Sequence, residues 1–247
     1  MSPDAALAFL LDGPLQSWGT SSRFQRRSTD AFPSKSGVVG LVAAAMGIDK
    51  HTADEPERLK PYAALQFSVY RLPRLMDHQP LPVERLSDYH TVGGGYDEDS
   101  DSWARLSTPR KASGGPFGTV LTQRDYLTDA AFVVVLQGPR LLLDKIASRL
   151  ADPVWGIWLG RKCCVPATPV LGCVAEDAAG ALAQIVRLAQ AGALRGDQPR
   201  WSYGQHAIAA RDLHKGETVA PQDGADTRAD QPLSYGQRRH ATRTIRS

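Results

Sequence analysis

The sequence predicts an α+β fold. Three observations lead to this prediction: apolar runs of strand length, two stretches with helical patterning, and the order in which they occur. A strand, a helix, two strands, a helix and a further strand follow one another. This is the order of a ferredoxin-like or RRM-like sandwich, whose helices cover one face of the sheet and leave the other face free. We expect the sandwich to occupy residues 1–160.

Each strand and helix is predicted from the local spacing of apolar and polar residues. Short, mostly apolar runs bounded by polar or turn residues predict strands, and longer runs with apolar residues three or four apart predict helices. The predicted strands are Ala5–Leu11, Ala64–Leu72, Ala130–Leu136 and Val154–Leu159, and the predicted helices are Ser36–Ile48 and Arg140–Leu150.

A long hairpin is expected as an insertion over about residues 73–127. Two alternating segments, Pro82–Val92 and Thr119–Leu127, flank a stretch rich in glycine, serine and acidic residues. The stretch at 93–102 holds too little apolar surface to become ordered by itself. We therefore expect a thumb-like arm whose tip, residues 93–116, becomes ordered against a partner.

Residues 161–247 are expected to form a small C-terminal subdomain. The pattern predicts a helix over Ala178–Gln190 and short strands near Trp201 and over Ala207–Leu213. The polar residues 214–232 are expected to form a loop.

Composition excludes several classes of protein. The chain has 247 residues, is 42% hydrophobic and has a net charge of +3, and its apolar runs are too short to cross a bilayer. We expect a cytoplasmic protein with no membrane partner. Its cysteines, Cys163, Cys164 and Cys173, form no CxxC pair, so neither a disulfide framework nor a zinc site is expected, and no cofactor or metal is predicted.

The start of the helix that follows Pro33 resembles an anion site. Ser34 or Ser36 can cap the helix, Gly37 permits close approach, and Lys35 places a cation beside the positive end of the helix dipole. An ordinary capped helix explains the same residues, and both interpretations remain open. The glycine spacing does not match a nucleotide-triphosphate loop.

The preceding motif, GPLQSWG at residues 13–19, also allows two interpretations. Gln16 and Ser17 offer hydrogen bonds, and the ring of Trp18 offers a face on which a base can stack. The alternative is a turn that leaves a strand and buries Trp18 in the core.

Two further segments carry candidate residues. Tyr89 and His90 lie in DYHTV, where His90 is a candidate base for metal-free RNA cleavage, although a lone histidine is more often a hydrogen-bonded structural residue. Arg161 and Lys162 lie in LGRKCC after a Trp-rich run. Because neighbouring residues on a strand face opposite sides, only one of these two cations is expected to reach a shared ligand. No acid, base and nucleophile are placed together as in a hydrolase.

Seven motifs occur in the order found in one family: GPLQSWG, SRF with Arg27 and Thr29, PSKSGVVGLVAAAMG, DYHTV, RDYLTDAAF, LGRKCC and PLSYGQR. On these motifs, which run from about residue 7 to residue 239, the chain resembles the CasD family, a subunit of Cascade, the type I-E CRISPR surveillance complex. The resemblance implies an RRM-like core of the repeat-associated RNA-binding superfamily, with a thumb hairpin and a small C-terminal part.

The resemblance also implies a function and partners. Such a subunit caps the 5′ handle of the mature CRISPR RNA (crRNA), contacts the adjacent backbone subunit and the large target-recognition subunit, and acts on target DNA only indirectly. Together with the cation and aromatic pattern, it gives these expected RNA-binding residues: Gln16, Ser17, Trp18, Arg23, Arg27, Lys35, Ser36, Tyr89, His90, Arg161 and Lys162. The subunit is expected to be non-catalytic.

One alternative comes from another class of function. Related subunits of the type I-C system trim the repeat, so a metal-independent endoribonuclease using His90 or Tyr89 with Lys35 is the competing hypothesis. The type I-E pattern argues against it, because that system resembles one with a separate processing enzyme.

Overall fold

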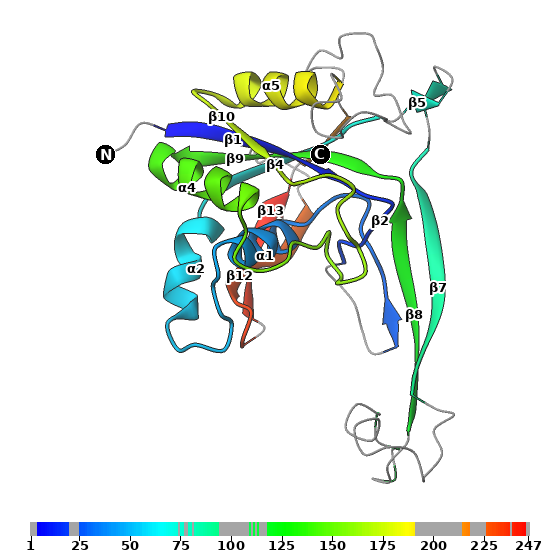
Figure 1. Cartoon of the computed structure of the whole chain (residues 1–247). Helices are drawn as coiled ribbons and strands as arrows, with labels where there is room; N and C mark the ends of the chain where they lie inside the picture. Colours follow the sequence, from blue (N-terminus) through cyan, green and yellow to red (C-terminus); the bar gives the residue numbers. More distant parts are fainter. Residues whose placement is uncertain are drawn as a thin grey trace.

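The computed structural model has a sheet-and-helix body from which a long hairpin projects (Figure 1). It describes residues 4–19, 25–73, 75–76, 79–80, 82–93, 109, 111, 113, 118–190, 214–217, 226–237 and 239–245. In these ranges no helix combines the length and the hydropathy that a membrane crossing requires.

The body is built on a five-stranded sheet in the order β10-β1-β9-β4-β11, with every neighbouring pair antiparallel. Its strands are β1 (Asp4–Asp12), β4 (Gln66–Arg71), β9 (Ala131–Pro139), β10 (Gly172–Ala175) and β11 (His214–Glu217). With helices between β1 and β4 and between β9 and β10, the first four strands have the ferredoxin-like arrangement. The predicted fold class is therefore confirmed.

The central strands are buried on both faces, and their alternation divides the core in two. Leu7, Phe9 and Leu11 of β1 face one layer, whereas Ala6, Ala8 and Leu10 face the other. The same alternation continues on β9, since successive side chains on a strand point to opposite sides. This two-sided burial explains why the strands are nearly continuous apolar runs in the sequence.

Helices cover both faces of this sheet. α1 (Lys35–Ala45), α2 (Glu55–Ala63) and α4 (Arg140–Ala151) contribute to the first core layer. α5 (Ala178–Gln190) covers the opposite face, where Leu182, Ile185 and Val186 pack against the second layer (Figure 1). The prediction that this face is free was wrong, because the apolar side of α5 lies on it.

Two further predictions need correction. Residues 154–159 form a loop, and the fourth strand of the sandwich is β10, which begins at Gly172. The segment 214–232, expected to be a loop, contains β11 and most of β12 (Asp226–Ser234). Three elements after residue 160, namely β10, α5 and β11, therefore belong to the main sheet and its cover. The strand candidates near Trp201 and over Ala207–Leu213 lie outside the described residues.

The predicted hairpin is present as β7 (Glu84–Gly93) and β8 (Thr119–Thr128), paired antiparallel along their whole length. β8 also pairs with β2 (Leu15–Gln16) and, in parallel, with β3 (Arg26–Arg27), which joins the hairpin to the body. A small pair, β5 (Leu75–Met76) and β6 (Gln79–Pro80), precedes it. Most of the tip, residues 93–116, lies outside the description.

A C-terminal hairpin of β12 and β13 (Arg239–Ile245) is tied to the helices by buried polar contacts. The carboxylate of Glu55, at the start of α2, accepts hydrogen bonds from the Ser234 hydroxyl at 2.6 Å and from the Tyr235 amide at 2.7 Å. The Tyr235 hydroxyl donates to the carbonyl of Ser36 at 2.5 Å, in the first turn of α1. The hairpin therefore reaches both α1 and α2.

Replacing the buried carboxylate should loosen this attachment. Glu55→Ala leaves the buried donors of Ser234 and Tyr235 without an acceptor, so we expect the free energy of unfolding to fall by about 3 kcal/mol in urea denaturation. Glu57→Ala on the same helix is the matched control, because Glu57 is exposed and its partner among the described residues is the exposed Lys60. Equal stabilities of the two variants would contradict a role for Glu55 in holding the hairpin.

Candidate functional site

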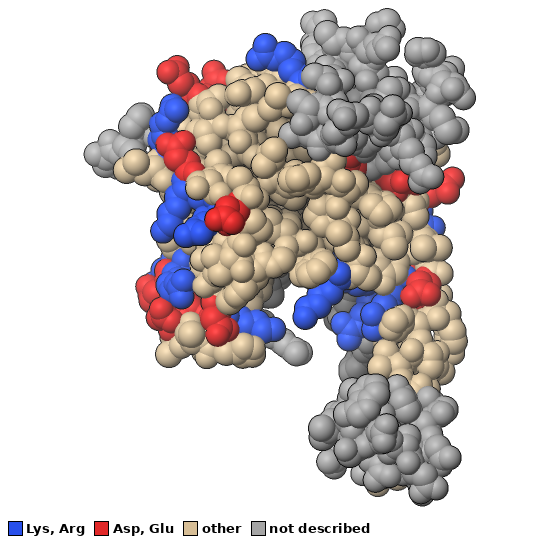
Figure 2. Space-filling model, in the orientation of Figure 1, with Lys and Arg blue, Asp and Glu red and all other residues tan. Residues whose placement is uncertain are grey.

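A cavity of about 210 Å³ lies where β2, β3, α1 and the loop after α4 meet. Among the residues that the structure describes, its lining includes two arginines and no acidic residue: Ser17, Trp18, Gly19, Arg27, Ser28, Ser34, Ser36, Gly37, Gly160 and Arg161. Figure 2 shows Lys and Arg side chains gathered in the notch between the body and the β7–β8 hairpin. The cavity therefore has the charge of an anion site.

The first turn of α1 forms one wall of the cavity. Ser34 is the N-cap, and its hydroxyl accepts a hydrogen bond from the Gly37 amide at 3.1 Å. Ser36 and Gly37 line the cavity beside it, so the positive end of the helix dipole lies at the site. The ordinary interpretation of this segment is confirmed, since Ser34 caps the helix, and the anion-site interpretation stays a prediction for a helix start that lines a cationic cavity.

Gln16 and Trp18 belong to the interior. The Gln16 amide donates to the carbonyls of Leu11 and Ala130 at 3.1 and 2.7 Å, and its oxygen accepts from the Trp18 indole at 2.9 Å. Trp18 is 1% exposed, and its ring packs against Gly37, where a Cβ would lie 2.8 Å from the ring. The prediction that Trp18 offers a face to a base is corrected: the close approach that Gly37 permits is that of this ring.

Arg161 is held by the backbone around it. Its guanidinium donates to the carbonyl of Asp125 at 3.1 Å and to that of Arg27 at 2.7 Å, and it lies 4.8 Å from the centre of the Tyr126 ring. Arg161 thereby joins β3 to β8 at the cavity wall. The Arg161 side chain lines the cavity, and its N–H groups also hold the backbone of Arg27 in place.

The loop after α4 is seated on the chain that leaves β2. The Ser17 amide donates to the Leu159 carbonyl at 3.0 Å, and the Ser17 hydroxyl donates to the Asp125 carbonyl at 3.2 Å. Gly160 has φ +96°, and a Cβ there would lie 1.8 Å from the Ser17 carbonyl oxygen. Only glycine allows this approach, so the contact at residue 160 fixes the backbone position from which the Arg161 side chain extends.

The remaining predicted residues are distributed around the cavity. Lys35 is 7% exposed and is not among the lining residues, and Lys162 is exposed beyond the wall. Thus one of the two adjacent cations lines the site, although they lie in a loop rather than on a strand. Arg23 lies outside the described residues.

Tyr89 and His90 lie on β7, away from the cavity lining. Tyr89 is 69% exposed, and the Nδ1 atom of His90 is 3.5 Å from the Asp88 carboxylate, with both side chains partly in solvent. The backbone carbonyl of His90 accepts a hydrogen bond from the Thr122 hydroxyl at 3.4 Å. The Asp88 carboxylate is thus the one ionisable partner that the structure gives His90 among the described residues, and neither residue lines the cavity.

Burial favours the neutral form of two weak acids close to Arg161, the Tyr126 phenol and the Cys164 thiol. Burial raises the pKa of the Tyr126 phenol, and it raises the pKa of the Cys164 thiol to about 11. A thiol with this pKa is almost entirely protonated at neutral pH and is a poor nucleophile. In the part of the chain that the structure describes, no three His, Cys, Asp or Glu residues are arranged to hold a metal ion. The site is suited to binding an anion.

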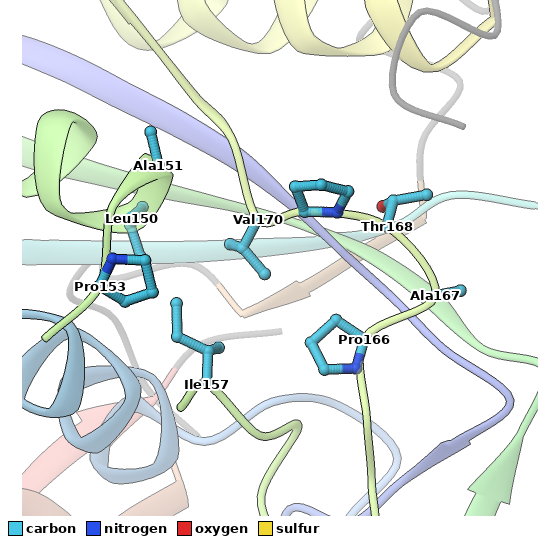
Figure 3. Close-up of a pocket in the computed structure, with 9 residues that line it drawn as sticks. Leu150, Ala151, Pro153, Ile157, Pro166, Ala167, Thr168 and Val170 are labelled. Carbon is cyan, nitrogen blue, oxygen red and sulfur yellow. The ribbon is translucent and has the colours of Figure 1, made fainter. Parts of the chain in front are cut away.

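A second cavity, of about 330 Å³, is apolar (Figure 3). It lies between the end of α4 and the loop that leads to β10, with Pro153, Ile157, Pro166 and Val170 in its wall. Thr168 also lines it, and its hydroxyl is the one buried side-chain polar atom without a hydrogen-bond partner among the residues described. None of the described residues that line this cavity is charged.

Sequence reasoning missed several lining residues. Ser28 follows the arginines of β3, Gly19 ends the GPLQSWG motif, and Gly160 precedes Arg161. The glycine next to Arg161 was the available signal, because a Trp-rich run that ends in Gly-Arg indicates a turn at which the backbone can approach another segment closely.

Known proteins match this chain over most of its length. Residues 6–246 match the family model described as CRISPR-associated protein (Cas_Cas5). The Cascade subunit CasD of the CRISPR system of Escherichia coli K12 is 30% identical over 181 residues, which cover 71% of this chain and 75% of that protein.

Two solved structures resemble the model over nearly its full length. A chain of a CRISPR RNA-guided surveillance complex superimposes with a TM-score of 0.63 at 30% identity, covering 98% of this chain and 88% of the other. A crystal structure of a Cas protein gives a TM-score of 0.55 at 26% identity, covering 98% and 92%.

The unpartnered hydroxyl in the apolar cavity gives a test of the packing. Thr168→Val keeps the side-chain shape and removes a buried polar group without a partner, so we expect the free energy of unfolding to rise by about 1 kcal/mol in urea denaturation. Thr122→Val is the matched control and should lower it, because the Thr122 oxygen accepts from Arg124 at 3.0 Å. Destabilisation by Thr168→Val would contradict this account of the cavity.

Proposed function

The chain belongs to the Cas5 family of CRISPR-associated proteins, and from this premise we propose that it is an RNA-binding subunit of a Cascade surveillance complex. In this proposal the cavity between β3 and α1 holds the 5′ handle of the crRNA. A relative that is named as a Cascade subunit and a similar chain within an RNA-guided surveillance complex support the assembly.

The observation that carries the proposal is the chemistry of the cavity wall. Arg27 and Arg161 supply two guanidinium groups, the first turn of α1 supplies the positive end of a helix dipole, and none of the described lining residues carries a carboxylate. Phosphate oxygens are the natural partners of such a wall. Because guanidinium groups and helix starts contact the backbone of a nucleic acid, they hold a strand in position without reading its bases.

The β7–β8 hairpin is proposed to contact neighbouring subunits. Exposed apolar side chains line it, namely Leu86, Tyr89, Val92, Val120 and Leu121. An extended arm with this much exposed apolar surface is typical of an element that is buried in an assembly. In this proposal the hairpin contacts the adjacent backbone subunit and the large target-recognition subunit. The complex reaches target DNA through these subunits.

The RNA is proposed to be held without being cut. Around the cavity, the described side chains provide cations and hydroxyls but no paired acid and base. His90 and the Asp88 carboxylate beside it lie on the hairpin and are not among the described lining residues, so this pair is not placed at the anion site.

The role of Arg27 is tested by the salt dependence of binding. We expect Arg27→Ala to weaken binding of RNA that carries the repeat-derived 5′ segment and to lower the slope of log K against log salt by about 0.7, as for one lost phosphate contact. Arg26→Ala is the matched control, since this neighbour on β3 faces away from the cavity lining. An unchanged slope in Arg27→Ala would remove Arg27 from the proposed site.

The absence of cleavage is tested with the same labelled repeat RNA, incubated with the protein first in chelator and then in magnesium. We expect a shifted band on a native gel and full-length RNA on a denaturing gel. A discrete cut that disappears in His90→Ala would instead make the chain a metal-independent endoribonuclease and would overturn the non-catalytic assignment.

A further inference from the structure

Two exposed indole rings lie on the loop between α4 and β10. Trp155 and Trp158 are 45% and 39% exposed, in contrast to the buried Trp18. We propose that Trp158 is a stacking platform for an unpaired base of the RNA whose backbone the cationic cavity holds. This inference rests on the proposed function and assigns the base-contacting surface that the cavity itself lacks.

The path of the loop brings Trp158 to the site. At one end, the amides of Val154 and Trp155 donate to the carbonyls of Ala45 and Ala44 at 3.0 and 3.3 Å, at the C-terminal end of α1. At the other end, Gly160 lines the cavity beside the N-terminal turn of the same helix. The loop therefore runs alongside α1 toward the cavity, and Trp158 comes two residues before its wall.

The ring is held in place before any ligand binds. The Trp158 carbonyl accepts from the Gly160 amide at 2.9 Å, and the next amide, that of Leu159, donates to Cys164 at 2.7 Å. The indole lies against Gly156, where a Cβ would be 3.0 Å from ring atom Cζ2. A ring fixed in this way loses little conformational freedom when a base stacks on it.

The positive charge near Trp158 favours a nucleic acid over a protein as the ligand of this surface. Arg27 and Arg161 line the adjacent cavity, and Arg26 and Lys162 are exposed close by along the chain. Figure 2 shows that the Lys and Arg side chains of this notch gather at one border of an uncharged surface. Aromatic rings beside a cationic groove are the arrangement with which proteins bind single strands without reading their sequence. A protein partner on the same surface is the competing outcome of the test below.

The test compares full-length variants in binding the repeat-derived RNA, by fluorescence anisotropy. We expect Trp158→Leu to weaken binding about 5- to 150-fold, as for loss of one stacked base, with the salt slope unchanged because no phosphate contact is lost. Trp158→Phe should restore most of the affinity because it restores an aromatic face. Trp155→Leu, with a similarly exposed ring at the far end of α1, is the matched control and should bind almost as the wild type does.

A second series identifies the base. Each nucleotide of the RNA is replaced in turn by an abasic unit, and one position should exist at which the wild type and Trp158→Leu bind equally. The inference is overturned if Trp158→Leu binds the intact RNA as the wild type does, if no abasic position equalises the two proteins, or if the variant loses only its assembly with a partner protein. Failure of the wild type to bind RNA at all would instead overturn the proposed function together with this inference.

Discussion

The geometry of the cationic cavity depends on one backbone contact, the close packing of Gly160 against the Ser17 carbonyl. The Ser17 amide bonds to Leu159, and residue 160 has a positive φ and no room for a side chain. This contact fixes the loop after α4 against the chain that leaves β2. Arg161, the next residue, then reaches the carbonyls of Asp125 and Arg27. Two parts of the chain far apart in sequence thereby become opposite walls of one cavity.

Patterns in the sequence predicted the elements whose burial is simple. β1 and β9 are buried on both faces and appear as continuous apolar runs, and the apolar spacing of Ala178–Gln190 predicted α5 with its observed bounds. The role of α5 could not be read from the same spacing, because an apolar stripe does not say which face of a sheet it covers. The run Val154–Leu159 suggested a strand, but the amides of Val154 and Trp155 donate to carbonyls at the end of α1 rather than to a sheet edge.

Most of the cavity wall could be predicted, but the roles of its members could not. Arg27, Ser36 and Arg161 carried signals of charge and capping that local sequence displays. Whether an aromatic ring is buried is decided by distant partners: the indole of Trp18 donates to Gln16, which in turn donates to the carbonyl of Ala130, 114 residues away in the sequence. Such a buried network is fully satisfied only in the complete fold, so sequence left Trp18 open between two roles.

The hydrogen bond from Tyr235 to the carbonyl of Ser36 has a consequence for the order of synthesis. Residues 34–37, which form one wall of the cavity, leave the ribosome long before the segment that braces them. A nascent chain can pair β1 with β9 and cover them with α4, but its α1 start lacks the contact with Tyr235 until the C-terminal hairpin has emerged. This wall of the cavity thus gains its contact with Tyr235 late in synthesis, and under the proposed function this favours loading of RNA onto finished chains over loading during translation.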